Sequence, residues 1–258
     1  MSIQRSAMGS TAQQGQAVVL AVNVGSSSLK FGLYARSSGP ALWSGQMEGL
    51  EPGGAGRLVV RGEPDQALEV LPGQDIFDAA LALLVHRLQR SAQQVQAVAH
   101  RIVHGGERCT QPRWLDADTL AYLTSIQSLA PLHQPHNLAG VAAFARVMPQ
   151  LPQVGCFDTA FHATLPEVER CLPIPRALAE QGIRRYGFHG LSYQYVQQAL
   201  QRHSQRAQGR VLMAHLGNGA SVCATLGGRS VATSMGFSAL DGLMMGTRSG
   251  SLDPGVLL

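Results

Sequence analysis

The segment from Ala17 to Tyr34, AVVLAVNVGSSSLKFGLY, decides the fold. Its first part, Ala17 to Asn23, is a short apolar run rich in valine, and Leu29 to Tyr34 is a second apolar run. Between them lies Gly25-Ser-Ser-Ser28, a composition typical of a tight turn. The order of apolar run, glycine-containing turn and apolar run predicts two strands joined in a hairpin.

A similar pattern recurs late in the sequence. The residues from Val19 to Lys30 align without gaps with those from Val211 to Val222, and the alignment superposes Gly25 on Gly217. Any hairpin gives an apolar, glycine, apolar order, so one short match leaves that simpler explanation open. Interpreted as a repeat, the two segments indicate a duplicated α/β domain whose two turns face one cleft. Because the second copy begins at Val211 of 258 residues, we expect the second domain to be incomplete.

Strand-like and helix-like segments alternate over the rest of the chain. Short runs rich in valine predict strands, and apolar residues at helical spacing predict helices. The predicted strands cover residues 57–60, 67–71 and 96–103, with another beginning at 154–158; the predicted helices cover 76–91, 116–129, 137–147 and 193–202. We expect a disordered tail over residues 1–16, a first domain over 17–152 and a truncated second domain over 153–258.

Composition and charge exclude several classes of protein. The net charge is +4 and the isoelectric point is about 9.1, but the basic residues are scattered and no aromatic residues alternate with them, which argues against a nucleic-acid partner. No apolar run approaches the roughly 20 residues of a membrane helix, so no membrane partner is expected. The four cysteines show no CxxC spacing, which favours a reducing compartment and a cytoplasmic location.

Both turns contain groups that bind phosphate. In Gly25-Ser-Ser-Ser28, backbone N–H groups and serine hydroxyls are donors, and Lys30, the only lysine of the chain, adds a positive charge. The spacing is not that of a Walker A motif, and an isolated loop of this kind is more often a plain turn. The second turn, Gly217-Asn-Gly219, is also the strongest short signal for a type I′ hairpin. A hairpin tip that faces a cleft satisfies both interpretations.

Four further clusters of polar residues follow strand-like or glycine-rich segments: HRIVHGG at 100–106, DTAFH at 158–162, RRYGFHG at 184–190 and MMGTRSG at 244–250. Phosphoryl transfer needs such a mixture, because its transition state spreads charge over three oxygens and is stabilised by positioned cations and hydrogen-bond donors. Each arginine taken alone is more often part of a surface ion pair. The histidines of the first cluster, His100 and His104, also leave a zinc site open, although no HExxH or paired-cysteine motif supports one. No G-x-S-x-G motif indicates a serine hydrolase.

Seven motifs, in this order, resemble those of the acetate kinases, the acetokinase family of the acetate and sugar kinase, Hsp70 and actin superfamily. The motifs are NVGSSSLKFGLY, HRIVHGGE, APLHQPHN, FDTAFH, GIRRYGFHGLSY, HLGNGAS and TSMGFSALDGLMMGTRSGSLDPG. The resemblance implies duplicated ribonuclease H-like (actin-like ATPase) domains with mixed sheets, the first an N-terminal acetokinase domain and the second an incomplete nucleotide-binding domain. It implies reversible, Mg²⁺- or Mn²⁺-dependent phosphoryl transfer from ATP to acetate, giving ADP and acetyl phosphate. It also implies a homodimer for the full-length protein.

The resemblance assigns roles to residues of this sequence. Asn23 resembles a metal ligand, and Ser26, Ser28 and Lys30 resemble the first phosphate loop. The loop that contacts ATP phosphates corresponds to His215, Leu216, Gly217, Asn218 and Gly219.

Four other residues resemble the catalytic set. Arg101 and Arg248 correspond to the pair that grips the carboxylate and then the migrating phosphoryl group, and His189 to the stabiliser of the transition state. Asp158 corresponds to an essential acidic residue that orients Arg101 or helps to position metal and substrate. The substrate-binding pocket corresponds to Arg101, Val103, Leu132, His133, Phe188 and Ala239.

Several positions depart from the family pattern. They are Gln134, His136, Leu191, Tyr193, Ala239 and Ser251, in place of asparagine, proline, threonine, histidine, proline and aspartate respectively. Alanine at 239 suggests a roomier pocket, so propionate or butyrate kinase activity is an alternative. A third alternative is a catalytically inactive, nucleotide-binding relic, because the resembled family continues well beyond the DPG segment at residues 253–255.

Overall fold

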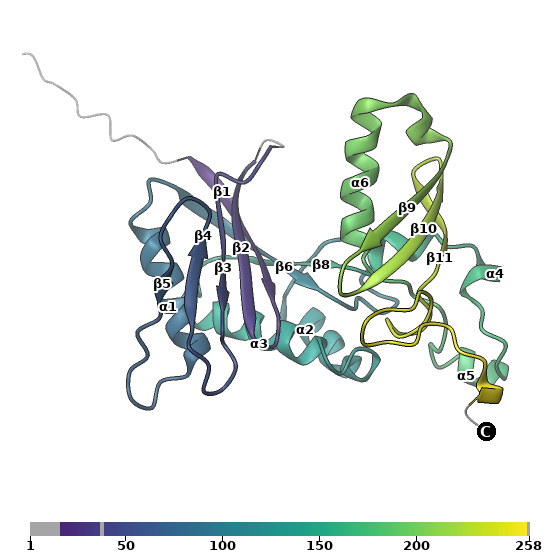
Figure 1. Ribbon diagram of the computed structural model, residues 1–258, viewed down its shortest axis with the longest axis horizontal. Helices are drawn as coiled ribbons and strands as arrows, with labels where there is room; N and C mark the ends of the chain where they lie inside the picture. Colours follow the sequence, from purple (N-terminus) through teal and green to yellow (C-terminus); the bar gives the residue numbers. More distant parts are fainter. Residues whose placement is uncertain (1–15, 37–38, 257–258) are drawn as a thin grey trace, which may run out of the picture.

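The computed structural model describes residues 16–36 and 39–256, which form two lobes (Figure 1). The predicted tail over 1–16 lies outside the described residues except for the exposed Gln16. In the first lobe, a mixed sheet of eight strands has the order β5-β4-β3-β2-β1-β6-β8-β7. The antiparallel part consists of β1 (Ala17–Val24), β2 (Ser28–Ala35), β3 (Trp43–Glu48), β4 (Arg57–Val60) and β5 (Gln66–Ala67).

The other half of the sheet is built on parallel pairing. Strand β6 (Gln94–Ile102) lies parallel to β1, and β8 (Gln153–Phe157) lies parallel to β6. The short β7 (Arg113–Trp114) closes the edge by antiparallel pairing with β8. The carboxyl ends of β1, β6 and β8 therefore meet at one edge of the sheet, where ligands bind in open α/β sheets.

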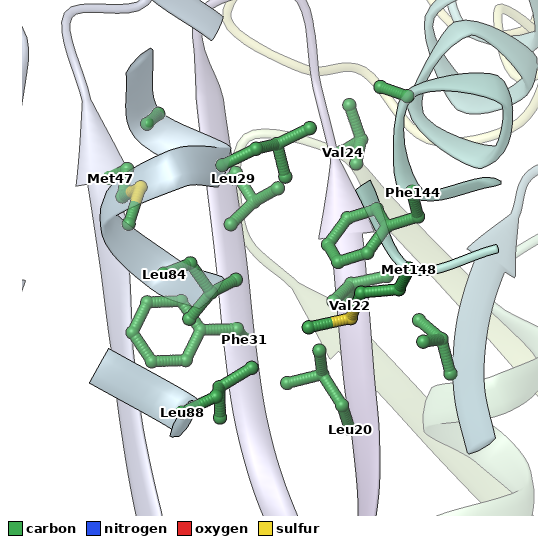
Figure 2. Packing of buried hydrophobic residues seen from close by; sticks show 14 of the residues in the cluster. Leu20, Val22, Val24, Leu29, Phe31, Met47, Leu84, Leu88, Phe144 and Met148 are labelled. Atoms are coloured by element: carbon green, nitrogen blue, oxygen red, sulfur yellow. The ribbon is translucent and has the colours of Figure 1, made fainter. Parts of the chain in front are cut away.

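Two helices cover one face of this sheet and form the main core (Figure 2). Helix α1 (Ile76–Gln89) begins at Asp75, whose side chain accepts from the N–H groups of Phe77 and Asp78. Helix α3 (Gln134–Val147) lies beside it. Strand β1 alternates strictly between half-buried and buried residues, so that one face enters the core and the other face remains open toward the second lobe. The buried side chains of this core, from the strands and from the two helices, include Leu20, Val22, Val24, Leu29, Phe31, Leu84, Leu88, Phe144 and Met148.

The second lobe contains a three-stranded antiparallel sheet of β9 (Arg210–Leu216), β10 (Ala220–Leu226) and β11 (Arg229–Thr233). Helix α6 (Gly190–His203) and a 3₁₀ helix at Ala160–Thr164 pack on it. Their small core joins Phe161 and Tyr193 to Met213 and Cys223. Strand β9 occupies an edge, and its residues Leu212 and Leu216 are exposed.

The remaining elements are short. Helix α2 (Ala117–Ser125) is followed by a 3₁₀ turn at Gln127–Leu129, and helices α4 (Glu167–Arg170) and α5 (Arg176–Ala179) lie on the outside of the second lobe. Two more 3₁₀ turns cover Gln205–Gln208 and Pro254–Val256. None of the described helices combines the length and apolar character needed to cross a lipid bilayer.

The two hairpins that align in sequence are equivalent in structure. Each joins the first two strands of an antiparallel three-strand meander, β1-β2-β3 in one lobe and β9-β10-β11 in the other. Their tips are Gly25-Ser-Ser27 and Gly217-Asn-Gly219, which have the same length. The repeat predicted from the sequence is therefore a repeat of strand order and turn.

Two sequence expectations differ from the structure by more than the exact ends of an element. The strand expected over 67–71 is reduced to Ala67, the last residue of β5, because the pairing of β5 with β4 ends there. The helix expected over 116–129 is interrupted at Ile126, where the backbone leaves the helical region. The domain division at 152/153 stays a prediction; by pairing, the eight-stranded sheet extends to Phe157.

Candidate active site

The carboxyl ends of three neighbouring strands bring Asn23, Arg101 and Asp158 into contact. Arg101 donates to Oδ2 of Asp158 from Nε at 3.0 Å and from Nη2 at 2.6 Å, and from Nη1 to Oδ1 of Asn23 at 3.1 Å. The Asp158 side chain is 3% exposed, whereas that of Arg101 is 37% exposed. A buried carboxylate thus fixes the direction of a guanidinium group that is still accessible to a ligand.

His189 lies next to this ion pair because helix α6 begins against Asp158. The backbone N–H of Gly190 donates to the carbonyl oxygen of Asp158 at 2.8 Å. A Cβ atom built on Gly190 would lie 2.2 Å from that oxygen, so only glycine permits this approach. His189 itself has φ 62° and ψ 17°, a left-handed conformation that costs a non-glycine residue roughly 1–3 kcal/mol. Strain of this kind is typical of residues that are held for function.

The imidazole of His189 is neutral at pH 7. Burial, and then the charges of His215, Arg101 and Arg248, lower its pKa to about 4. A neutral imidazole has one N–H donor, and it can offer that donor to an anion without changing its own charge.

The tip of the second hairpin closes the site from the other side. A Cβ atom built on Gly219 would lie 3.0 Å from Nε2 of His189 and 3.5 Å from Nη1 of Arg248. Arg248 is anchored by donating from Nη1 to the carbonyl oxygen of Ala239 at 3.1 Å. Backbone, imidazole and guanidinium groups from three separate segments therefore converge on one space.

An apolar cavity of about 140 Å³ opens beside Arg248. Its lining includes the apolar residues and the histidine expected for the acyl pocket, namely Val103, Leu132, His133, Phe188 and Ala239. Burial lowers the pKa of His133, and the charges of Arg101 and Arg248 lower it further. The cavity thus has a mainly apolar lining that includes one guanidinium group, Arg248, which suits a short carboxylate, whereas Arg101 lines a separate hollow with Asn23 and Lys30.

Of the predicted phosphate-loop residues in the first hairpin, Lys30 lies near the cluster around Asp158, and Ser26 lies in a different hollow. Lys30 lies directly opposite Asn23 in the β1–β2 register, and both line one hollow of about 310 Å³ together with Arg101. Ser26 lines a separate hollow of about 450 Å³ against α1 and α3. Ser28 begins β2 and is half-buried. The structure therefore joins Lys30 to the cluster around Asp158, but it does not bring Ser26 there.

The second loop is joined to His189 by stacking of two imidazole rings. The rings of His215 and His189 stack with centroids 4.0 Å apart and planes 22° apart. Nδ1 of His215 lies 2.9 Å from Oγ of Ser192, in the first turn of α6. After His215 in the chain, Leu216, Gly217 and Asn218 are exposed, so this part of the tip is accessible to a ligand.

Sequence reasoning missed a buried residue that holds the strand ends in place. Asn137 of α3 accepts from the N–H of Val103 at 3.0 Å and donates to the carbonyl oxygen of Val24 at 2.9 Å. It is 4% exposed, and it joins the last residue of β1 to the residue just after β6. The signal was a polar residue on the core-facing side of an otherwise apolar helix, which must be hydrogen-bonded when buried.

The oxygen atoms of Asn23 and Asp158 fit a divalent cation that a nucleotide carries. Mg²⁺ is usually held by one or two carboxylates together with water and substrate phosphates. Both hydrogen bonds from Arg101 to Asp158 end on Oδ2, which leaves Oδ1 for a further contact. Within the described parts of the chain, no group of three or more His, Cys, Asp or Glu gathers as in a zinc centre.

Named acetate and propionate kinases match almost the whole chain. An acetate kinase of Rhodopseudomonas palustris (strain ATCC BAA-98 / CGA009) is 46% identical over 253 residues, covering 93% of this chain and 63% of that protein. A propionate kinase of Citrobacter freundii is 42% identical over 246 residues, covering 93% of this chain and 61% of that protein. The chain thus spans somewhat less than two thirds of the length of these relatives.

Solved structures agree in fold. A propionate kinase of Francisella tularensis subsp. tularensis SCHU S4 has a TM-score of 0.82 at 36% identity, and acetate kinase of Porphyromonas gingivalis has 0.81 at 37%. Each comparison covers 93% of this chain and 63% of the other. The α/β fold of ribonuclease H-like type predicted from the sequence is confirmed. The family description "Acetokinase family" matches residues 18–258, and the chain therefore belongs to the acetokinase family.

Proposed function

We propose that this chain carries the phosphoryl-transfer centre of an acetate kinase, which converts ATP and acetate reversibly into ADP and acetyl phosphate. The observation that carries the proposal is the convergence of His189 and Arg248 at Gly219 beside an apolar cavity of about 140 Å³, with Arg101 held by Asp158 at the neighbouring strand ends. Three donor groups around one space and a small apolar cavity beside it are what a carboxylate and a migrating phosphoryl group require.

The proposed reaction is a direct in-line transfer. Acetate lies with its methyl group in the cavity and its carboxylate against Arg101 and Arg248. A carboxylate oxygen forms a bond to the γ-phosphorus while the bond from that phosphorus to the bridging oxygen of ADP breaks. No proton has to move and no phosphoenzyme forms. The protein acts by positioning the reactants and by donating hydrogen bonds to the equatorial oxygens, and His189 and the two arginines supply these donors.

Asp158 acts in this scheme through Arg101. Its buried carboxylate holds the guanidinium group by two charge-assisted hydrogen bonds before any substrate arrives. Such preorganisation means that no reorganisation is needed when charge develops in the transition state. Asp158 is therefore a positioning residue that also has an oxygen to offer to metal-bound nucleotide.

The nucleotide phosphates are assigned to the two hairpin tips and Lys30. Asn218 and Gly219 supply backbone N–H groups, whereas the N–H of Gly217 already donates to the carbonyl oxygen of Gly219 at 3.1 Å. Lys30 supplies a point charge next to Asn23. Mg²⁺ or Mn²⁺, held by Asn23, Asp158 and the phosphates, would neutralise charge on the transferring group. Ser26 and Ser28 are assigned to the same phosphate loop on the strength of the sequence motif.

Propionate is a second candidate substrate because two observations favour it. A relative at 42% identity and a solved structure with a TM-score of 0.82 are propionate kinases. In addition, the small side chain of Ala239 lines the cavity and leaves space for a longer acyl chain. One methylene group changes discrimination by only about 1–3 kcal/mol. Butyrate is longer than propionate by one methylene group, and the same cavity would have to accommodate it.

The proposal extends to the cellular location, the domain division and the oligomeric state of the protein. The cysteines, Cys109, Cys156, Cys171 and Cys223, are all free thiols, as expected for a reducing cytoplasm. The domain division near residue 152 and a homodimer belong to the same proposal and follow from the family resemblance.

The experiment is an acetyl phosphate assay in which hydroxylamine traps the product as acetyl hydroxamate. The chain is expected to form hydroxamate only with ATP, acetate and a divalent cation together, and Arg101→Ala and Arg248→Ala each lower kcat by at least about 100-fold. Titration calorimetry with Mg-ATP measures nucleotide binding separately from turnover. A folded chain that neither binds Mg-ATP nor forms hydroxamate would support the inactive relic instead, and unchanged kcat in both arginine variants would refute the assigned roles.

A further inference from the structure

A chain of hydroxyl groups stands behind the catalytic histidine. Nδ1 of His189 lies 2.8 Å from Oγ of Ser221 on β10, and the same Oγ lies 2.5 Å from the phenolic oxygen of Tyr193 on α6. Ser221 is 0% exposed and Tyr193 is 1% exposed. The two hydroxyl groups are therefore shielded from bulk water and pair with each other and with Nδ1 of His189.

The direction of these hydrogen bonds follows from counting donors. A serine hydroxyl has one proton, and a tyrosine hydroxyl has one proton. Burial raises the pKa of Tyr193, so the phenol keeps its proton at neutral pH. Within the described residues, the one acceptor within hydrogen-bond distance of that proton is Ser221 Oγ. If Tyr193 did not donate to Ser221, a buried O–H would be left unpaired, at a cost of about 1–3 kcal/mol.

Ser221 Oγ could accept from both neighbours, but its own hydrogen would then have no acceptor, because His189 Nδ1 is its one other partner among the described residues. The buried serine therefore directs its proton to the histidine. Its oxygen accepts from Tyr193, and its hydrogen is donated to Nδ1 of His189, which consequently carries no proton. A neutral imidazole with a bare Nδ1 is protonated on Nε2. Nε2 is the nitrogen that faces the hairpin tip, 3.0 Å from a Cβ built on Gly219.

We infer that Tyr193 and Ser221 are positioning residues, which fix His189 in the Nε2–H tautomer and direct its single donor into the space between Gly219 and Arg248. The inference deepens the proposed function, on which the need for such a donor rests, but the tautomer itself is a property of the free chain. In the other tautomer, Nε2 would present a lone pair to the phosphoryl oxygens and repel them. Neither Tyr193 nor Ser221 has to touch substrate.

The test is the ¹⁵N NMR spectrum of the chain labelled in its histidine side chains, at pH 7. The His189 signals are assigned by their loss in His189→Gln. We expect a pyridine-type Nδ1 and a pyrrole-type Nε2 in the unmodified chain, and a mixture of both tautomers in Tyr193→Phe and Ser221→Ala. Ser221→Thr, which keeps the hydroxyl, restores the single tautomer. Tyr195→Phe, an exposed tyrosine on the same helix, is the matched control and leaves the spectrum unchanged.

Kinetics provide an independent arm. Tyr193→Phe is expected to lower kcat by about tenfold or more with little change in KM for acetate, since the acyl cavity is untouched. A pyrrole-type Nδ1 in the unmodified chain would overturn the inference, whether or not the variants fold. A single unchanged tautomer in folded Tyr193→Phe and Ser221→Ala would overturn it as well. Because the spectrum needs no turnover, an inactive chain with the expected tautomer would count against the proposed function alone.

Discussion

Replacing Gly190 by alanine tests how helix α6 is attached to the site. The added Cβ would lie 2.2 Å from the carbonyl oxygen of Asp158 and 2.8 Å from Cβ of Phe161. Ordinary contacts need more than 3 Å, so the helix start has to move by about 1 Å. Overpacking of this kind costs roughly 1–3 kcal/mol, and weakening the hydrogen bond from Gly190 to Asp158 costs about 0.5–1.5 kcal/mol more. The lower entropy of the unfolded alanine chain offsets about 0.4–1 kcal/mol.

The net expectation for Gly190→Ala is a loss of about 1–3 kcal/mol in the free energy of unfolding. For a chain of this size this corresponds to a fall in Tm of roughly 2–10 °C. A displacement of about 1 Å at the neighbouring His189 is expected to lower kcat by about 100-fold. The assays are thermal unfolding by circular dichroism and the hydroxamate assay. Gly39→Ala, where no atom lies within 4 Å of the new Cβ, is the control. Stability within 0.5 kcal/mol of the unmodified chain, with kcat unchanged, would refute the attachment described above.

Three further results are expected. Asp158→Asn removes the charge that orients Arg101, and we expect it to lower kcat by about 100-fold or more in the hydroxamate assay. We expect it to lower the free energy of unfolding by roughly 1–3 kcal/mol in a urea titration. A variant with unchanged activity would contradict this role. Burial lowers the pKa of His104 and of His162 to about 4, so between pH 6.5 and pH 4 the unfolded chain binds protons that the folded chain does not bind. As pH falls through this range, each histidine lowers the free energy of unfolding by up to roughly 3 kcal/mol. A Tm that stays constant from pH 7 to pH 4.5 would show that these rings are not buried. Ala239→Val narrows the acyl cavity and should reduce kcat/KM for propionate at least about tenfold more than for acetate, whereas equal losses would place the cavity elsewhere.

The hairpins and the alternation of the strands were predictable from the sequence for a simple reason. In β1 every second residue from Val18 to Val24 is buried, and this pattern is determined by the pleat of a strand alone. The same holds for helix α1, whose start is set by the side chain of Asp75. Local rules of this type do not depend on distant parts of the chain.

The geometry of the site depends on contacts across long stretches of sequence, so it could be expected only through the family resemblance. Arg101 meets Asp158 because two parallel strands end at the same edge, and the sequence around either residue does not show which strands are neighbours. Tyr193 and Ser221 meet because α6 packs on β10, and no local pattern marks them as a pair. The break of helix 116–129 at Ile126 is likewise a departure from periodicity that apolar spacing does not reveal.

The most direct test of the central claim is a crystal structure of the chain grown with Mg²⁺, ADP, acetate and aluminium fluoride, a planar mimic of the migrating phosphoryl group. The account predicts that the fluoride lies between the Gly217–Gly219 tip and Arg101, with its fluorine atoms within hydrogen-bond distance of Arg101, Arg248 and Nε2 of His189. Electron density that places the mimic on another face, or an occupied site in which both guanidinium groups turn away from it, would contradict the account.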